Sequence, residues 1–296
     1  MQEPSTSRLS PEQLRAFIES CAPLPQRNFR LFVLLGLGAL MGVVLFSGPS
    51  MIALLLPWVV VIGFFGWLYY QRRRMTEAQR SVRAVQELTV LRHHDEALHQ
   101  AWRILPSLRR WADLHVQTVL LASADLMAVN AYENALAAQD YLLEHAPDDH
   151  PLARMVRLQR TMALLHDDRL ADADDELRRL SRLKLGPLGQ AMRRVGELYQ
   201  QLKTGHHVDA VESLDDDAAF ISQLRPLGVD AGYGYAMMAT MYHHTGRTDA
   251  AQRWWHRATM LVAPQRLADD LPETRPLTAL QPATTLAEAM EADRHG

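Results

Sequence analysis

Apolar residues follow two different patterns along this chain. Residues 31–70 are almost wholly apolar, and only a turn-like stretch at residues 47–50 interrupts them. From Met75 onward the pattern changes to helical-looking segments that polar turns separate. The first pattern predicts helices surrounded by lipid, and the second predicts amphipathic helices that pack on one another. The sequence therefore predicts an all-α protein.

The apolar stretch is long enough for two membrane spans. Apart from Arg30 near its start, the run at residues 29–46 carries no charge, and neither does the run at residues 51–70; about 20 helical residues cross a bilayer core. Gly48 and Pro49 lie between the two runs and favour a turn. We therefore expect a two-helix transmembrane hairpin over residues 29–70. The alternative is a hydrophobic hairpin buried inside a soluble protein.

Charged residues beside these runs predict the orientation. Arg27 and Arg30 flank the start of the first run, and Arg72, Arg73 and Arg74 follow the second. Positive residues stay on the cytoplasmic side, so we expect both termini and the rest of the chain in the cytoplasm. The arginine triplet also suits anionic lipid headgroups, although topology alone accounts for it.

Small residues in the first run indicate close helix packing. Gly38 and Gly42 are four residues apart, and Gly36 is nearby. Such residues let two membrane helices approach closely. The contact is expected within the hairpin, and an oligomer formed through the hairpin is the alternative.

The tail at residues 1–28 contains one predicted helix. Ser10 has the character of an N-cap, Pro11 suits the first helical position, and Gln13 completes a capping box. We expect a short amphipathic helix from Pro11 to about Cys21. It either lies on the membrane surface or docks on the helices that follow.

Alanines mark a repeat in the remainder of the chain. They are separated by 38, 38, 37 and 41 residues, and each follows a polar turn: Ala97, Ala135, Ala173, Ala210 and Ala251. A period of this length is typical of helical arrays, whose helix pairs bury their apolar faces on their neighbours. We expect an α-solenoid of about five helix pairs, at 76–105, 113–146, 151–183, 187–225 and 230–263.

The last pair resembles the tetratricopeptide repeat. The residues that carry the resemblance are Tyr235, Met238, Ala239, Tyr242, Gly246, Ala251, Trp255, Ala258 and Pro264. Matches in the other pairs include Asp95-Glu96-Ala97, Tyr132, Gly205 and Pro147, and the resemblance covers residues 75–264. It implies a stack of antiparallel helix pairs whose first helices line a concave groove. Such grooves bind peptides or protein segments, and the family does little chemistry.

The resemblance places several polar residues in this groove. The candidate partner-binding residues are Arg154, Arg157, Arg160, Arg193, Arg194, Tyr199, Tyr233 and His243. The arginines suit an acidic peptide or a carboxylate, because guanidinium groups bind carboxylates through two hydrogen bonds. The alternative is a solvated face in which the arginines pair with acids such as Asp172 and Glu176.

Histidines gather at the turns inside the pairs, as at His206-His207 and His243-His244. We expect them to be polar turn residues, with successive turns too far apart to share a metal ion. A pH-responsive edge is the alternative. The sequence has no zinc motif, phosphate-binding loop or nucleophile elbow, so we expect no metal, no cofactor and no catalysis.

These observations together favour a membrane-anchored scaffold that binds a protein or peptide partner. The net charge of −3 gives no reason to expect nucleic acid as a partner. Prolines after Pro264 predict a largely disordered tail at residues 265–296, or a strap on the last pair. One alternative is a structural subunit of a larger membrane complex that assembles through the hairpin. A regulatory or enzymatic protein with unrecognised chemistry is another.

Overall fold

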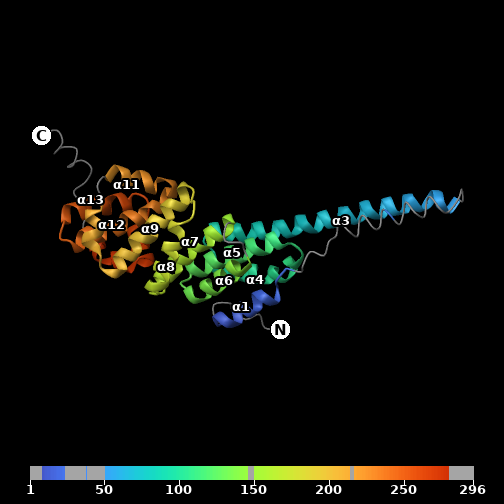
Figure 1. Cartoon of the computed structure of the whole chain (residues 1–296), viewed down its shortest axis with the longest axis horizontal. Helices are drawn as coiled ribbons and strands as arrows, with labels where there is room; N and C mark the ends of the chain where they lie inside the picture. The colour runs from blue at the N-terminus through green and yellow to red at the C-terminus, as the bar shows by residue number, and fades with distance from the viewer. Residues whose placement is uncertain (1–8, 24–37, 39–50, 146–149, 214–216, 280–296) are drawn as a thin grey trace. The chain divides into compact units, whose positions relative to one another are not determined.

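The computed structural model describes residues 9–23, 38, 51–145, 150–213 and 217–279, apart from the side chains of residues 51–60. Helices and turns account for this part of the chain, and no strand occurs within it (Figure 1). The all-α prediction is therefore confirmed. The chain divides into two compact units, Met1–Leu142 (unit 1) and Leu143–Gly296 (unit 2).

The described part of unit 1 includes five α-helices and one short 3-10 helix. The long helix α3 (Met51–Val90) packs on α4 (His94–Ile104) and on α5 (Ala112–Ala128), and η2 (Leu105–Arg110) connects α4 to α5. Helices α1 (Pro11–Ser20) and α6 (Tyr132–His145) complete the unit.

Helix α1 begins with the predicted capping box. The Gln13 backbone N–H donates to Ser10 Oγ over 3.3 Å, and the Ser10 backbone N–H donates to Gln13 Oε1 over 3.2 Å. Leu14 and Ile18 are buried, and the ring of Phe17 meets that of Trp102 in α4 edge to face at 6.1 Å. Of the two predicted positions, α1 therefore adopts the docked one.

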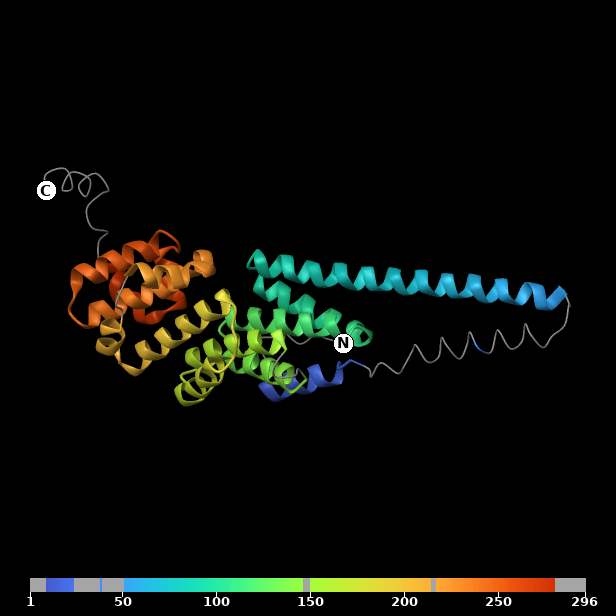
Figure 2. The ribbon, with the colours of Figure 1, turned by 45° about the horizontal axis from the view of Figure 1, so that its top comes forward.

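Helix α3 is continuous from the apolar sequence into the repeat region. Its C-terminal half buries Ala78, Val82 and Val85. Its N-terminal half has none of the described helices of its unit beside it (Figures 1 and 2). Within the part of the chain that the structure describes, no helix meets the length and hydropathy required for a membrane span. Residues 29–46, except Gly38, lie outside the described residues.

Unit 2 is a stack of helices. Helix α7 (Pro151–His166) packs on α8 (Leu170–Ser181) and on α9 (Pro187–Thr204), and α9 packs on α12 (Ala231–His244), which packs on α13 (Thr248–Thr259). Between α9 and α12 the chain forms three short elements, α10 (His207–Glu212), α11 (Asp217–Leu224) and η3 (Arg225–Asp230). They account for the longest interval between repeat alanines, because the fourth pair carries this extra segment.

The segment after the last pair is more ordered than the sequence predicts. Helices α14 (Pro264–Asp270) and η4 (Pro272–Ala279) fold back, and η4 packs on α12. Leu267, Leu271 and Leu277 are buried there, so apolar contact offsets the helix-breaking effect of the prolines. The predicted alternative, a strap on the last pair, holds for residues 264–279. Residues 280–296 lie outside the described part.

The turns inside the five helix pairs share one backbone geometry. In each, the residue five positions before the repeat alanine has a positive φ: Arg92, Asn130, Asp168, Gly205 and Gly246. The next backbone N–H in each turn bonds a carbonyl five residues earlier, over 2.9–3.0 Å, as in Ala131 to Leu126 and Arg247 to Tyr242. This pattern is a Schellman motif, which ends a helix in the left-handed conformation. The sequence repeat is therefore a repeat of the same turn.

The repeat alanines themselves are all buried. Each is 0% exposed, and each backbone N–H makes the first helical bond of the second helix: Ala97, Ala135, Ala173, Ala210 and Ala251. A larger side chain there would force the paired helices apart. Close packing therefore explains the periodic small residue.

Replacing Gly246 with alanine should lower the free energy of unfolding by about 1 kcal/mol. The φ of Gly246 is 75°, and no neighbouring atom lies within 4 Å of the position of an added Cβ, so the cost comes from the backbone conformation. Chemical denaturation measures it. Gly66→Ala in α3 serves as a control, because Gly66 has equal space and a helical backbone. Equal effects of both substitutions would contradict the prediction.

Candidate functional site

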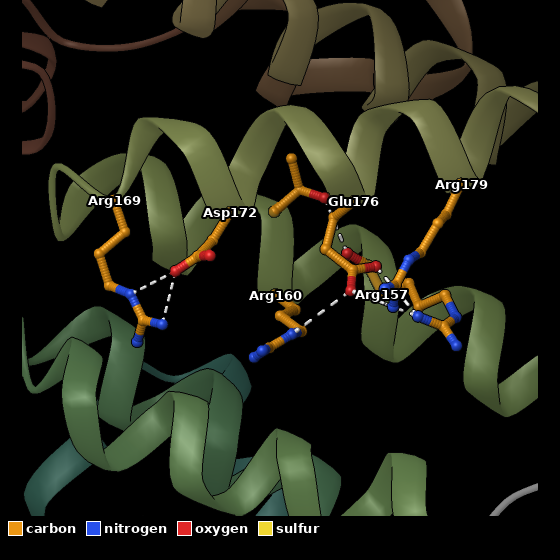
Figure 3. Close-up of polar contacts among 7 residues, drawn as sticks. Arg157, Arg160, Arg169, Asp172, Glu176 and Arg179 are labelled. Atoms are coloured by element: carbon orange, nitrogen blue, oxygen red, sulfur yellow. Dashed lines mark hydrogen bonds and ion pairs between the residues drawn. The ribbon is translucent and has the colours of Figure 1, made fainter.

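Two arginines of the predicted stripe on α7 converge on one carboxylate of α8. Arg157 Nη1 donates to Glu176 Oε2 over 3.1 Å, and Arg160 Nε lies 3.6 Å from Glu176 Oε1 (Figure 3). The Glu176 side chain is only 7% exposed, and Arg179 approaches it from the same helix, 3.4 Å away. Arg154 instead donates to the Lys184 carbonyl over 2.8 Å. The structure therefore favours the paired interpretation for Arg157 and Arg160, and it identifies Glu176 as the centre of the cluster.

Arg193 and Arg194 lie on α9 beside a pocket. Glu197 contacts both, at 3.4 Å from Arg193 Nε and 3.3 Å from Arg194 Nη1. The pocket has a volume of about 710 Å³, within the usual range for ligand sites. We call it the α9 pocket, and its lining includes Leu185, Gln190, Arg193, Arg194, Phe220 and Pro226. Both of these predicted arginines therefore lie in the lining of a pocket.

Tyr199 is buried rather than groove-facing. Its hydroxyl group is 3.3 Å from His166 Nδ1, and the two rings meet at 4.9 Å. The Lys203 ammonium group lies 5.4 Å from the Tyr199 ring centre and pairs with Asp168 at 2.8 Å and with Glu273 at 3.0 Å. Asp168 and Glu273 raise the pKa of Lys203 despite the opposing effect of burial, which is the largest contribution. This cluster links η4 to α9, because Glu273 belongs to η4 and Lys203 belongs to α9.

Tyr233 and His243 lie on α12 and have separate surroundings. The Tyr233 hydroxyl donates to Asp270 of α14, and the Arg266 guanidinium lies 6.0 Å from the Tyr233 ring centre. The His243 ring contacts that of His244 at 6.1 Å. Tyr233 thus contacts α14, and neither Tyr233 nor His243 lines the α9 pocket.

Two histidines from successive turns lie closer together than the sequence predicts. His207 in α10 and His244 at the end of α12 stack at 4.5 Å, with their rings 12° from parallel. The helices α10 and α12 pack together, and this contact brings the two turns side by side. Stacked rings do not direct their nitrogens at one point. Among the described residues, no group of three or more possible ligands could hold a metal ion.

A polar cluster in unit 1 was not predicted. Asp125 of α5 is 0% exposed. It accepts a hydrogen bond from Thr89 Oγ1 over 2.8 Å, and its other carboxylate oxygen lies 2.8 Å from His94 Nδ1. Burial raises the pKa of Asp125, and the bonds to His94 and Thr89 oppose this shift. The cluster ties α5 to the turn between α3 and α4. Nothing in the sequence pattern indicates this pairing, because Asp125 looks like an ordinary polar position on a helix.

Residues 61–70 of α3 form an apolar and exposed segment. Every residue from 61 to 70 is exposed, and the most exposed large side chains include Ile62, Phe65 and Tyr69. Of the glycines predicted to pack membrane helices, Gly38 is helical with no atom within 4 Å of an added Cβ, whereas Gly36 and Gly42 lie outside the described residues. Gly63 and Gly66 of α3 are equally open. A helix that is apolar on all sides is normally buried in protein or in lipid.

Comparisons with known proteins give no match: no protein-family model, no curated protein and no solved structure is similar to this chain.

Unit 2 should lose stability when the pH falls from about 7.5 to about 5.5. The pKa of His166 is lowered mainly by burial and, to a smaller extent, by the positive charge of Lys203. The pKa of His207 is likewise lowered mainly by burial, with smaller contributions from His244 and His206. The unfolded chain binds protons on these histidines at a higher pH than the folded chain, so acid favours unfolding below about pH 6.5.

Thermal unfolding across this pH range measures the effect. His166→Gln and His207→Gln should each reduce the dependence of stability on pH. His256→Gln is the control, because His256 is exposed on α13. A pH dependence that neither of the first two substitutions reduces would refute the assignment.

Proposed function

We propose that this protein is a membrane-anchored scaffold of tetratricopeptide type that recruits a protein or peptide partner at the cytoplasmic face, without catalysis. The exposed apolar segment of α3 at residues 61–70 carries this proposal. Leaving such a surface in water is unfavourable, and soluble proteins rarely expose a large contiguous apolar patch. A bilayer would cover all sides of the helix at once, as a transmembrane hairpin over residues 29–70 requires.

The repeated turns and buried alanines support the scaffold part of the proposal. Stacked helix pairs offer extended surfaces for partners, and anchoring them raises the local concentration of whatever they bind. The α9 pocket, with Arg193 and Arg194 in its lining, is a surface of unit 2 that suits a partner segment.

Membrane extraction of the full chain tests the anchor. The wild-type chain should float with phosphatidylcholine liposomes and resist alkaline extraction. Ile62→Arg combined with Phe65→Arg should reduce the membrane-bound fraction sharply, because each arginine costs about 2.5–3.5 kcal/mol within a span. The control pair, Leu188→Arg with Val208→Arg, alters two exposed apolar residues of unit 2 and should leave flotation unchanged. Release of the wild-type chain by alkaline extraction would overturn the proposal.

A structural subunit of a larger membrane complex is the second candidate. The open glycines of α3, Gly63 and Gly66, favour it, because they would allow another membrane helix to approach closely. Exchanging residues 29–70 for an unrelated two-span anchor separates the two functions. Partner capture by crosslinking in intact membranes should survive the exchange for a scaffold and fail for a complex subunit.

A further inference from the structure

Five arginines follow the exposed apolar segment of α3, and four of them lie on one side of the helix. At 3.6 residues per turn, they fall within about 100° of one another and roughly opposite the buried residues Ala78, Val82 and Val85. We call them the α3 arginine stripe: Arg72, Arg73, Arg80 and Arg83. The stripe therefore occupies the outer side of α3, away from α4 and α5.

The stripe is exposed and largely free of counter-charges. Arg73 pairs with Glu77 at 3.2 Å, and both of these side chains are more than half exposed. No carboxylate among the described residues contacts Arg72, Arg80 or Arg83. Glu87 ends the stripe on the side farther from the apolar segment. A net positive surface on a chain of net charge −3 indicates a specific anionic partner.

We infer that the α3 arginine stripe binds anionic phospholipid headgroups of the same bilayer that the proposed function assigns to α3. The inference rests on that function, since the stripe directly continues the apolar segment. Arg72 lies where the headgroup layer would begin. Arg83 lies about 17 Å further along the helix axis.

The direction of helical side chains brings the distal arginines back toward the bilayer. Side chains of an α-helix lean toward its N-terminus, and the N-terminal half of α3 is the apolar half. The headgroup layer is about 5–8 Å thick, and the surface potential of an anionic leaflet extends by a further Debye length of about 8 Å. Arg80 and Arg83 therefore lie within the attractive field.

A nucleic acid is the competing anionic partner. The lipid is favoured because the stripe is a single helix side next to an exposed apolar segment. Nucleic-acid sites usually combine a strongly basic domain with a wider surface.

The test uses the full chain in neutral detergent, titrated with short-chain phosphatidylserine and, separately, with short-chain phosphatidylcholine. Native mass spectrometry reports the bound lipid. The serine lipid should bind more tightly, and added salt should weaken it. Arg80→Gln with Arg83→Gln should raise its dissociation constant about five- to twentyfold. These two arginines lie outside the triplet that sets topology, so insertion is preserved.

The matched control, Arg103→Gln with Arg109→Gln, removes the same charge from exposed positions of unit 1 and should change nothing. Equal binding of the two lipids, or equal binding by the stripe variant and the wild type, would overturn the inference. Displacement of the lipid by inorganic phosphate or by a single-stranded oligonucleotide at physiological salt would also overturn it. Flotation with pure phosphatidylcholine liposomes tests the membrane anchor independently of the arginines. A chain that floats but does not prefer the serine lipid would therefore contradict this inference and leave the proposed function standing.

Discussion

Replacing Glu176 with alanine should lower the free energy of unfolding by about 3 kcal/mol. The Glu176 side chain is 7% exposed, and the side chains of Arg157 and Arg160 are only 13% and 17% exposed. Removing the carboxylate takes away the shared counter-charge of two cations that water reaches poorly. The expected loss is therefore much larger than that of a surface ion pair.

Two variants on the same helix make this prediction specific. Asp172→Ala removes a carboxylate whose partner Arg169 lies 2.6 Å away, but both side chains are about half exposed, so the expected loss is below about 1 kcal/mol. Glu176→Gln keeps the shape and one acceptor, and should give an intermediate loss. Urea denaturation measures all three. A loss at Glu176 no greater than the loss at Asp172 would show that the cluster does not stabilise the α7–α8 contact.

Replacing Trp254 with alanine should cost about 3–5 kcal/mol of stability. The Trp254 side chain is 1% exposed, and its ring contacts those of Phe220 and Tyr235, each at 5.5 Å. The substitution leaves a cavity where α11, α12 and α13 meet. Phe220 also lines the α9 pocket, so the pocket wall should loosen as well.

Calorimetry of the full chain measures the loss, and hydrogen exchange localises it. Exchange should increase in α11 more than in α7, because Phe220 loses its main ring contact. Met260→Ala is the control: Met260 is 64% exposed, and the expected change is within about 0.5 kcal/mol. A stable Trp254→Ala variant with unchanged exchange in α11 would contradict the aromatic cluster as the link between these helices.

Much of the fold could be predicted because it depends on local chemistry. Ser10, Pro11 and Gln13 specify the start of α1 through a cap that needs no distant contact. The repeat alanines mark the second helices because an alanine five residues beyond a left-handed turn has the same surroundings in every pair. Gly205 and Gly246 supply two of these turns. Arg92 gives no such signal, since arginine rarely adopts a positive φ.

The candidate site was only partly predictable, because it depends on which helices meet. The pattern predicted an arginine stripe on α7 and acids on α8 without indicating that Glu176 contacts Arg157 and Arg160. Tyr199 was expected to face a groove, but its side chain is buried beside His166. His207 and His244 are 37 residues apart in sequence, and only the packing of α10 on α12 makes them neighbours.

The sequence by itself determined the helical class, the register of the repeat and the apolar surface of α3. Each of these follows from the spacing and polarity of residues close together in the chain. The tertiary structure decided which charges are neutralised, which aromatic rings are buried and which side of α3 keeps its arginines exposed. Those outcomes require contacts between distant residues, because burial of a charge or a ring depends on what covers it.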